Sequence, residues 1–265
     1  MGNEQNQDVF VEAADVLTRM GAVLMDRDAE PGGKHILVAC APKSGSTYLS
    51  DCLAALPGFL KADLCFGYGS REQELCIYRA AAMHAVDYVA QHHVRYSETT
   101  ARFMRSFRIF PVVIVRNLYD TVVSLRDHVR EKPAPSPMAY VDERFLTWDE
   151  GRQLDFIIDF MLPWYANFLM SWSRYEGPCV RLLYRDFVSH PQEMLTTVAA
   201  AAGLDRPSAD IAAAIARVDP HGSRFNVGRT GRGREVLSQA QIARIGDMFA
   251  AYADVEDVRQ VLTLA

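Results

Sequence analysis

A lysine surrounded by small polar residues stands out at positions 41–47, where the chain reads Ala-Pro-Lys-Ser-Gly-Ser-Thr. The apolar run at 35–40 predicts a buried strand directly before it, and the pattern becomes helical from Gly45. A loop between a strand and a helix N-terminus presents backbone N–H groups to an anion, and a glycine lets that backbone come close. Further donors are available from Lys43, Ser44, Ser46 and Thr47. The sequence therefore predicts a phosphate- or sulfate-binding loop.

A P-loop nucleotide-binding enzyme, such as a nucleotide kinase, is the main alternative for this loop. Its motif is Gly-x-x-x-x-Gly-Lys-(Ser/Thr). Here Lys43 precedes Gly45 and the first glycine of that motif is absent, so the match is partial. A plain strand-to-helix turn is a second alternative, which the combination of a lysine with four small residues disfavours.

A second anion site is expected at the end of the apolar run 110–116, the clearest strand pattern in the chain. An arginine at the carboxyl end of a strand, as Arg116 would be, can bind a phosphate through two parallel hydrogen bonds. Ser124, about two turns into the helix expected at 117–131, can donate to the same group. An ion pair between Arg116 and Asp120 is the alternative role for this arginine.

The two segments resemble the nucleotide-binding motifs of the PAPS-dependent sulfotransferases (PAPS, 3′-phosphoadenosine 5′-phosphosulfate). Positions 42–47 match the family pattern Pro-Lys-Ser-Gly-(Ser/Thr)-Thr of the 5′-phosphosulfate loop, and Arg116, Asn117, Asp120 and Ser124 match the motif for the 3′-phosphate. The resemblance implies a P-loop-like sulfotransferase fold, PAPS as sulfuryl donor, PAP as product and no metal. It also implies that Lys43 stabilises charge on the leaving phosphate. A nucleotide-dependent kinase stays the alternative function.

Two further segments resemble the family less closely. Tyr184 follows an apolar run, in the place of the family segment that contacts the adenine, and 228–232 resembles the C-terminal loop that closes over the 3′-phosphate. By this resemblance the ligands from that loop are Arg229, Thr230, Gly231 and Arg232. Which of the two arginines reaches the phosphate stays open, and solvated arginines in a mobile loop are the alternative.

Position 48 departs from the cytosolic, hormone-metabolising members, which have Trp where this chain has Tyr48. A tyrosine can still stack on adenine, with less area. The C-terminal Arg-Lys-Gly of those members is also absent. The chain is therefore more similar to bacterial and carbohydrate-type members, and a steroid or phenol acceptor is not favoured.

A hydroxyl acceptor needs a general base near the sulfur. In hydroxyl-sulfating relatives a histidine ends the strand between the two phosphate motifs, in a Lys-x-His segment, and Gln91-His92-His93 occupies that place here. Strand alternation sends the two histidines to opposite faces, and the register favours His93. His92 and Glu98 are the other candidates, because a carboxylate is the base in some carbohydrate-type members.

The acceptor pocket is expected to combine residues 65–70, the proline-rich loop after Glu131 and aromatic side chains. The aromatic candidates are Trp148, Phe156 and Trp164, for which a place in the core is the alternative. The acceptor itself, whether a small molecule, a lipid or a carbohydrate, is not encoded in any recognisable motif.

The elements that must position these residues alternate between strand and helix, which predicts one α/β domain at 35–265 with a central parallel sheet flanked by helices. Further strands are expected at 88–94 and 179–183, and helices at 71–90, 98–107, 151–175 with a kink at Pro163, 191–202 and 208–216. A loop is expected at 221–235, followed by a final helix capped by Ser238. Residues 1–34 are expected to form a helical arm. Its helix at 8–27 packs through one face or alternatively binds another subunit in a homodimer, and that face comprises Val9, Ala13, Val16, Leu17, Met20 and Leu24.

Composition limits the partners. The 265-residue chain carries a formal net charge of −5, which argues against a nucleic-acid partner. Its five cysteines are scattered without a Cys-x-x-Cys pair, so neither a zinc site nor a disulfide framework is indicated, and a cytoplasmic location is expected. No apolar run reaches about 18 residues and the polar N-terminus lacks a basic region, so neither a membrane-spanning helix nor a signal peptide is expected.

Overall fold

The computed structural model describes residues 13–25, 27–29, 32–65, 74–131, 133, 136, 138–219 and 230–263. Within these ranges five strands form one fully parallel sheet in the order β2-β3-β1-β4-β5. The strands are β1 (His35–Cys40), β2 (Leu60–Ala62), β3 (Tyr88–His92), β4 (Ile109–Val115) and β5 (Val180–Leu183). The predicted α/β fold with a central parallel sheet is confirmed.

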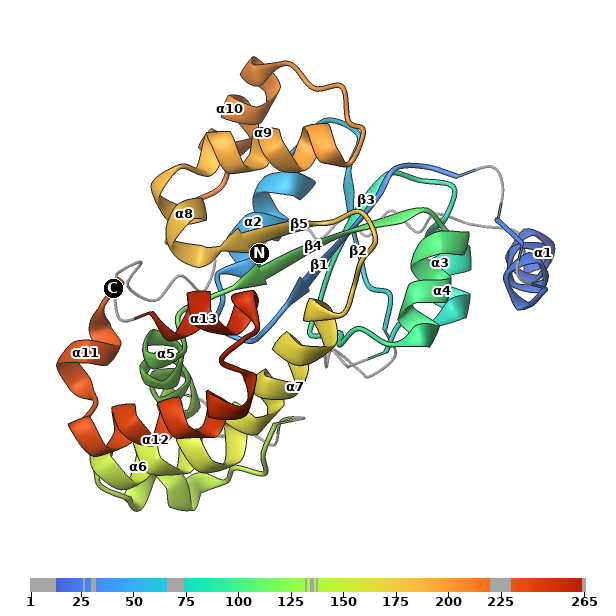
Figure 1. The fold of residues 1–265 in the computed structure, drawn as a ribbon. Coiled ribbons are helices and arrows are strands. Elements are labelled where there is room, and N and C mark those ends of the chain that lie inside the picture. The colour runs from blue at the N-terminus through green and yellow to red at the C-terminus, as the bar shows by residue number, and fades with distance from the viewer. Residues whose placement is uncertain are drawn as a thin grey trace.

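Helices connect the strands and cover both faces of the sheet (Figure 1). In chain order they are α1 (Ala13–Leu24), α2 (Ser46–Ala54), α3 (Ile77–Met83), α4 (Glu98–Ser106), α5 (Leu118–Glu131), α6 (Glu150–Phe156), α7 (Leu162–Ser173), α8 (Tyr184–Ser189), α9 (Pro191–Ala201), α10 (Ser208–Arg217), α11 (Arg232–Val236), α12 (Gln239–Phe249) and α13 (Glu256–Leu262). Three short turns of other helix types lie at Glu143–Thr147, Ile157–Met161 and Ala250–Tyr252.

Alternation along the central strands divides the interior into two cores. In β1, Ile36 and Val38 face one core, with α2, α9 and α10, whereas Leu37 and Ala39 face the other, with α4, α5 and α7. Every residue of β1 is buried, as expected of a parallel strand covered on both faces. Burial on both sides fixes the register of β1 and with it the position of the loop that follows.

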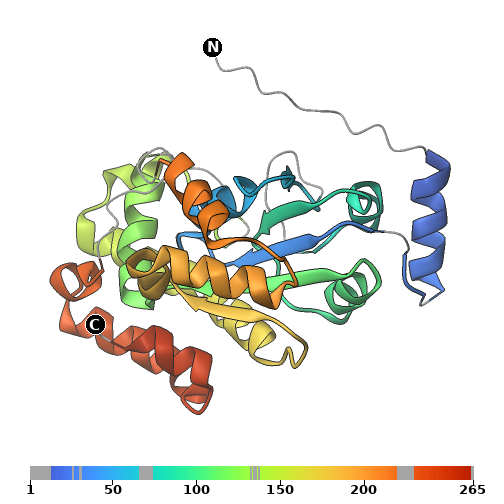
Figure 2. The ribbon, with the colours of Figure 1, turned by 90° about the horizontal axis from the view of Figure 1, so that it is seen from above.

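All five strands point away from α1, so their carboxyl ends lie together at one end of the sheet (Figures 1 and 2). The chain order reverses around β1, whose neighbours β3 and β4 lie on opposite sides of it. Ligands of open parallel sheets bind at such a reversal point, beyond the carboxyl ends of the strands. The fold therefore brings residues 41–47, 93, 116 and 184 to the carboxyl end of the sheet.

Helix α1 buries only part of the predicted apolar face. Val16 and Val23 are buried and Met20 is partly buried against the core, whereas Leu17 and Leu24 are 66% and 64% exposed. The prediction is confirmed for Val16 and Met20 and wrong for Leu17 and Leu24, because only the side toward α3 and α4 has a partner in the described part of the chain.

The second half of the chain matches the prediction at Ser238 and differs from it around Pro163 and after Gly231. A π-helical turn at Ile157–Met161 separates α6 from α7, which carries Pro163 in its first turn, where a missing N–H is tolerated. Ser238 caps α12 as predicted and forms a capping box with Gln241. Residues 232–236, expected in a loop, form α11, and α13 follows α12.

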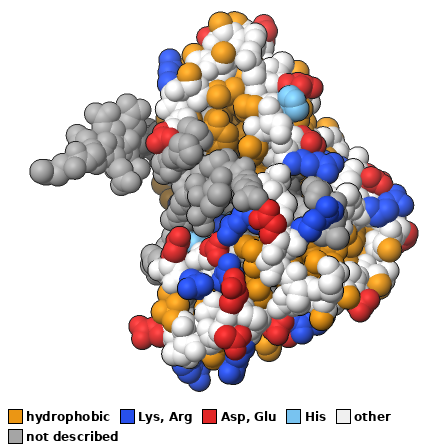
Figure 3. Space-filling model, turned by 90° about the vertical axis from the view of Figure 1, so that its left-hand side faces the viewer, with side chains coloured by type: hydrophobic (Ala, Val, Ile, Leu, Met, Phe, Trp, Pro, Cys, Tyr) orange, Lys and Arg blue, Asp and Glu red, His pale blue; other side chains and the backbone are white. Residues whose placement is uncertain are grey.

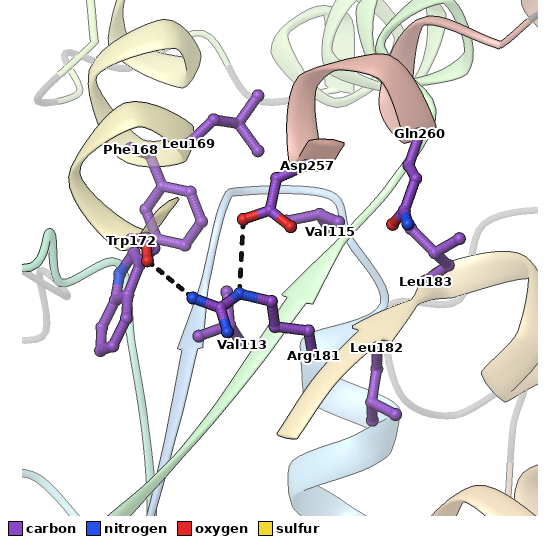
Figure 4. Close-up of a pocket in the computed structure, with 10 residues that line it drawn as sticks. All are labelled: Val113, Val115, Phe168, Leu169, Trp172, Arg181, Leu182, Leu183, Asp257 and Gln260. Atoms are coloured by element: carbon purple, nitrogen blue, oxygen red, sulfur yellow. Dashed lines mark hydrogen bonds and ion pairs between the residues drawn. The ribbon is translucent and has the colours of Figure 1, made fainter. Parts of the chain in front are cut away.

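A small pocket lies between β4, β5, α7 and α13 (Figure 4). Its walls are mainly apolar, and its polar side chains are Arg181, Asp257 and Gln260. Arg181 donates to the carbonyl oxygen of Trp172 at 2.9 Å and pairs with Asp257 at 3.3 Å, so it connects α13 to the edge strand β5.

Among the described helices, none combines the length and the apolar character that crossing a lipid bilayer requires.

Candidate active site

The loop after β1 adopts the conformation that an anion-binding turn requires. Lys43 and Gly45 both have positive φ, 63° and 80° respectively, and α2 begins directly afterwards at Ser46. The Ser44 hydroxyl donates to the carbonyl oxygen of Ala41 at 2.7 Å, which holds the turn closed. With its N–H groups at the start of α2, this backbone fits a phosphate or sulfate group. Lys43 and Thr47 are half-buried, whereas Ser44 and Ser46 are buried.

Gly45 packs against the Cδ2–Cε2 edge of the Tyr184 ring. A Cβ atom added at position 45 would lie 2.4 Å from Cδ2 of that ring, well inside contact distance. Glycine is therefore required here both for its positive φ and for the space. Tyr184 itself is buried at the carboxyl end of β5, and burial raises the pKa of its hydroxyl.

Arg116 joins the two predicted anion-binding segments. Its Nη1 donates to the carbonyl oxygen of Lys43 at 3.3 Å, and its guanidinium carbon lies 4.4 Å from the centre of the Tyr184 ring. Burial lowers the pKa of Arg116 from its ordinary value, but a guanidinium remains charged at neutral pH. A half-buried cation therefore lies at the carboxyl end of β4, beside the loop that follows β1.

Tyr165 is a site residue that the sequence did not reveal. Its hydroxyl donates to the carbonyl oxygen of Pro42, across 123 positions of sequence. The side chain is buried, and burial raises the pKa of its hydroxyl well above the ordinary value. No local pattern distinguishes it from the other aromatic residues of α7, so only the tertiary structure identifies it as the residue that holds the loop from that helix.

The two candidate histidines have different environments. His92 is buried, and its Nε2 accepts a hydrogen bond from the backbone N–H of Leu64 at 2.8 Å. His93 is half-buried, and its Nδ1 lies 2.9 Å from the carbonyl oxygen of Cys40. Because a carbonyl oxygen only accepts, Nδ1 of His93 carries the hydrogen, and the neutral ring has its lone pair on Nε2. The ring of Trp164 meets that of His93 edge-on, with centroids 6.4 Å apart.

Gln91 connects β3 to the start of α2. Its Nε2 donates to the hydroxyl oxygen of Ser46 at 2.7 Å, and the side chain is buried. Gln91 therefore contacts the predicted anion-binding loop at the start of α2. Glu98, the third candidate base, is exposed in the first turn of α4.

The first half of α5 carries the second predicted motif. Asn117 accepts a hydrogen bond from the backbone N–H of Asp120 at 3.1 Å, which caps the helix. Asp120 and Ser124 are both buried. The carboxylate of Asp120 accepts hydrogen bonds from the backbone N–H groups of Gly231 and Gly233, which brings the end of the C-terminal loop to α5.

The C-terminal loop is described only from Thr230 onwards, so Arg229 lies outside the described residues. Thr230 is exposed, while Gly231 and Arg232 are half-buried at the start of α11. The Arg232 guanidinium donates to Asp127 at 2.6 Å. Figure 3 shows the surface at the end of the molecule toward which the strands point. Arginine and lysine side chains lie near acidic ones on that surface.

The remaining predicted residues divide between the cores and the site. Tyr48 is 8% exposed and packs against Phe187 with ring centroids 5.3 Å apart, so its contact with adenine stays a prediction. Trp148 and Phe156 pack against each other at 5.5 Å, whereas Trp164 adjoins His93. Of the expected acceptor segment 65–70, only the buried Cys65 is described.

The fold has clear counterparts among solved structures. No protein-family model matches the sequence, and no curated protein sequence matches it. Mouse sulfotransferase SULT7A1 complexed with PAP superposes with a TM-score of 0.65 and 15% identity, over 94% of this chain and 92% of that chain. Retinol dehydratase in complex with androsterone and the inactive cofactor PAP superposes with a TM-score of 0.55 and 11% identity, over 91% of this chain and 85% of that chain. Sulfotransferase STF9 from Mycobacterium avium superposes with a TM-score of 0.53 and 13% identity, over 91% of this chain and 81% of that chain.

These matches cover 91–94% of this chain. The chain therefore has the sulfotransferase fold.

Proposed function

We propose that the protein is a PAPS-dependent sulfotransferase that transfers a sulfuryl group to a hydroxyl of a small-molecule, lipid or carbohydrate acceptor. The observation that carries the proposal is the hydrogen bond between Arg116 and the carbonyl oxygen of Lys43. It joins two cationic segments, each suited to one phosphate group, at the carboxyl ends of adjacent strands. A donor with phosphate groups at two separate ends explains both, and two of the structural counterparts were solved with PAP.

The residues fit such a nucleotide. The N–H groups of the 43–47 loop and the Lys43 ammonium would hold the 5′ end, while Arg116 and Ser124 would hold the 3′-phosphate. PAPS supplies an activated sulfuryl group on a phosphate leaving group. As that bond breaks, the positive charge of Lys43 and the loop N–H groups would stabilise the developing negative charge.

His93 is the proposed general base. The acceptor oxygen attacks the sulfur, the bond from sulfur to the leaving phosphate oxygen breaks, and the acceptor proton passes to Nε2 of His93. The hydrogen bond from Nδ1 to Cys40 supports this role, because it fixes the tautomer with the lone pair on Nε2. His92 is less suited, since its Nε2 already accepts from Leu64.

The acceptor pocket would lie beside His93 and Trp164. An aromatic wall suits an acceptor with an apolar part next to its hydroxyl group. Retinol dehydratase was also solved with retinol, an alcohol with an apolar chain, which is consistent with this proposal. A cytoplasmic location is also proposed, because the five cysteines are scattered without a Cys-x-x-Cys pair.

Ligand-dependent melting tests the donor. PAP is expected to raise the Tm of the protein more than ATP with Mg²⁺ does, because only PAP has a phosphate for each cationic segment. Lys43→Ala is expected to remove most of that shift. Lys61→Ala, at an exposed lysine of β2 paired with Asp51, is the matched control and should keep it. A larger shift with ATP and Mg²⁺ would favour the kinase.

Turnover is tested with ³⁵S-labelled PAPS and pooled hydroxylated metabolites. Transfer of label to an acceptor, lost in Lys43→Ala, would support an enzyme. Tight PAP binding without transfer to any pool would instead indicate a nucleotide-binding protein without catalysis.

A further inference from the structure

Asp120 places a buried carboxylate where an anion site is proposed. Its side chain is 3% exposed, in the first turn of α5. One carboxylate oxygen accepts the backbone N–H of Gly231 at 3.0 Å, and the other accepts that of Gly233 at 2.8 Å. Both oxygens therefore bind the same short segment, which is more than 110 positions away in the sequence. Hydrogen bonds to a charged carboxylate are about twice as strong as neutral ones.

The two glycines fit this contact closely. A Cβ atom added at Gly233 would lie 2.4 Å from Cβ and 2.5 Å from the carbonyl carbon of Tyr119, so only glycine lets α11 approach α5 this far. Gly231 has a φ of 85°, which turns the chain into α11. The sequence Gly-Arg-Gly at 231–233 is thus adapted to the surface of α5 around Asp120.

A second carboxylate holds the residue between the glycines. Asp127 accepts from Arg232 at 2.6 Å and from Arg126 at 2.8 Å. Burial alone would raise the pKa of Asp127, but the hydrogen bonds from Arg232 and Arg126 outweigh it and hold that pKa below the ordinary value. Residues 231–233 are therefore attached to α5 at three points.

Ser124 stands between the two carboxylates. Positions 120, 124 and 127 follow the i, i+4, i+7 spacing, so they share one face of α5. The serine that matches the 3′-phosphate motif is thus flanked by the two residues that hold the C-terminal segment in place.

We propose that Asp120 is a positioning residue for the 3′-phosphate site: it holds residues 231–233 against α5, next to Ser124 and Arg116, without contacting the phosphate itself. A carboxylate so near an anion site would repel the ligand if its oxygens faced the phosphate, but both oxygens face N–H groups of the C-terminal segment. Asp127 has the same role toward Arg232. This inference rests on the proposed function, since it assigns the second anion site to the donor's 3′-phosphate.

The test compares PAP with 5′-AMP, which lacks the 3′-phosphate, by isothermal titration calorimetry on the full chain. In the wild type, PAP is expected to bind at least about tenfold more tightly than AMP. Asp120→Asn preserves the shape but replaces one acceptor oxygen by an NH₂ group facing an N–H donor. It is expected to weaken PAP about tenfold while the Kd for AMP changes less than about twofold.

Two glycine variants provide an independent check. Gly233→Ala is expected to show the same selective loss of PAP affinity, because the added methyl group separates α11 from α5. Gly246→Ala on α12, where an added Cβ meets no atom within 4 Å, is the matched control and should leave both Kd values unchanged.

The outcomes separate the two proposals. A wild type that does not prefer PAP over AMP overturns the proposed function itself. A wild type that prefers PAP, together with Asp120→Asn and Gly233→Ala variants that keep the full preference, overturns only the positioning role of Asp120. Equal losses for PAP and AMP would also overturn it, because they indicate a general structural effect.

Discussion

The Nδ1 atom of His93 lies 2.9 Å from the carbonyl oxygen of Cys40, at the carboxyl end of the neighbouring strand β1. The contact relates the candidate base to the anion-binding loop, because Cys40 ends the strand from which that loop starts. A backbone carbonyl does not titrate, so it holds the ring in one tautomer at every pH at which the ring is neutral. The Sγ atom of Cys40 also lies 3.4 Å from the same Nδ1, so the last residue of β1 contacts His93 through both its carbonyl and its thiol.

Replacing His93 tests this arrangement. His93→Asn can keep a donor to the Cys40 carbonyl but has no basic nitrogen, so kcat is expected to fall by about 10²–10⁴ while the Kd for PAP stays the same. Labelled sulfate transfer and calorimetry measure the two quantities. His190→Asn, at an exposed histidine before α9, is the control. If His93→Asn keeps the wild-type kcat, the base is another residue.

Arg116 is expected to be irreplaceable by lysine. Arg116→Lys keeps the positive charge but loses the planar fork that reaches both the Lys43 carbonyl and a phosphate, and it loses the stacking on Tyr184. The Kd for PAP should rise about tenfold or more, whereas that for 5′-AMP should change less. Unchanged PAP binding would show that Arg116 has a structural role only.

Tyr165→Phe removes one oxygen atom from a buried contact. The carbonyl oxygen of Pro42 then loses its donor, and the free energy of unfolding should fall by about 1–3 kcal/mol. Because that carbonyl belongs to the anion-binding loop, the Kd for PAP should rise as well. Urea denaturation and calorimetry on the same variant measure both effects, and a loss of stability without a loss of affinity would mean that the loop does not depend on Tyr165.

Asp127 should make stability depend on acid pH. Its pKa is lower in the folded chain than its ordinary value of 3.8, so its ion pairs stabilise the fold above that pH and are lost as the pH falls through the folded pKa. Asp127→Asn should therefore lower the Tm by about 2–4 °C at pH 7 and by progressively less below about pH 4. Asp155→Asn, at a half-exposed aspartate paired with Arg244, should show little of this dependence. A Tm difference between wild type and Asp127→Asn that is constant from pH 7 to pH 3 would contradict the ion-pair assignment.

The parts of the site that could be predicted from sequence are those encoded locally. The apolar runs that became β1 and β4, and the loop directly after β1, are each contained within about ten residues. Ser238 as a helix cap is a local signal of the same kind. β2 was missed because it has three residues, none of them buried, and therefore no pattern to detect.

Contacts between distant segments could not be predicted in this way. Asp120 with Gly231, Tyr165 with Pro42 and Gln91 with Ser46 join residues that are 45 to 123 positions apart. The exposed leucines of α1 show the same limit, because the periodicity of a helix does not indicate which side will find a partner.

The contact between Gly45 and the ring of Tyr184 has a consequence for the history of such chains. Positions 45 and 184 share one volume, so a lineage that acquires a side chain at the first position must reduce the ring at the second or pull the two strand ends apart. Pulling them apart would also separate Arg116 from the ring on which it lies. The loop and the end of β5, far apart in the sequence, are therefore constrained to evolve as a single unit.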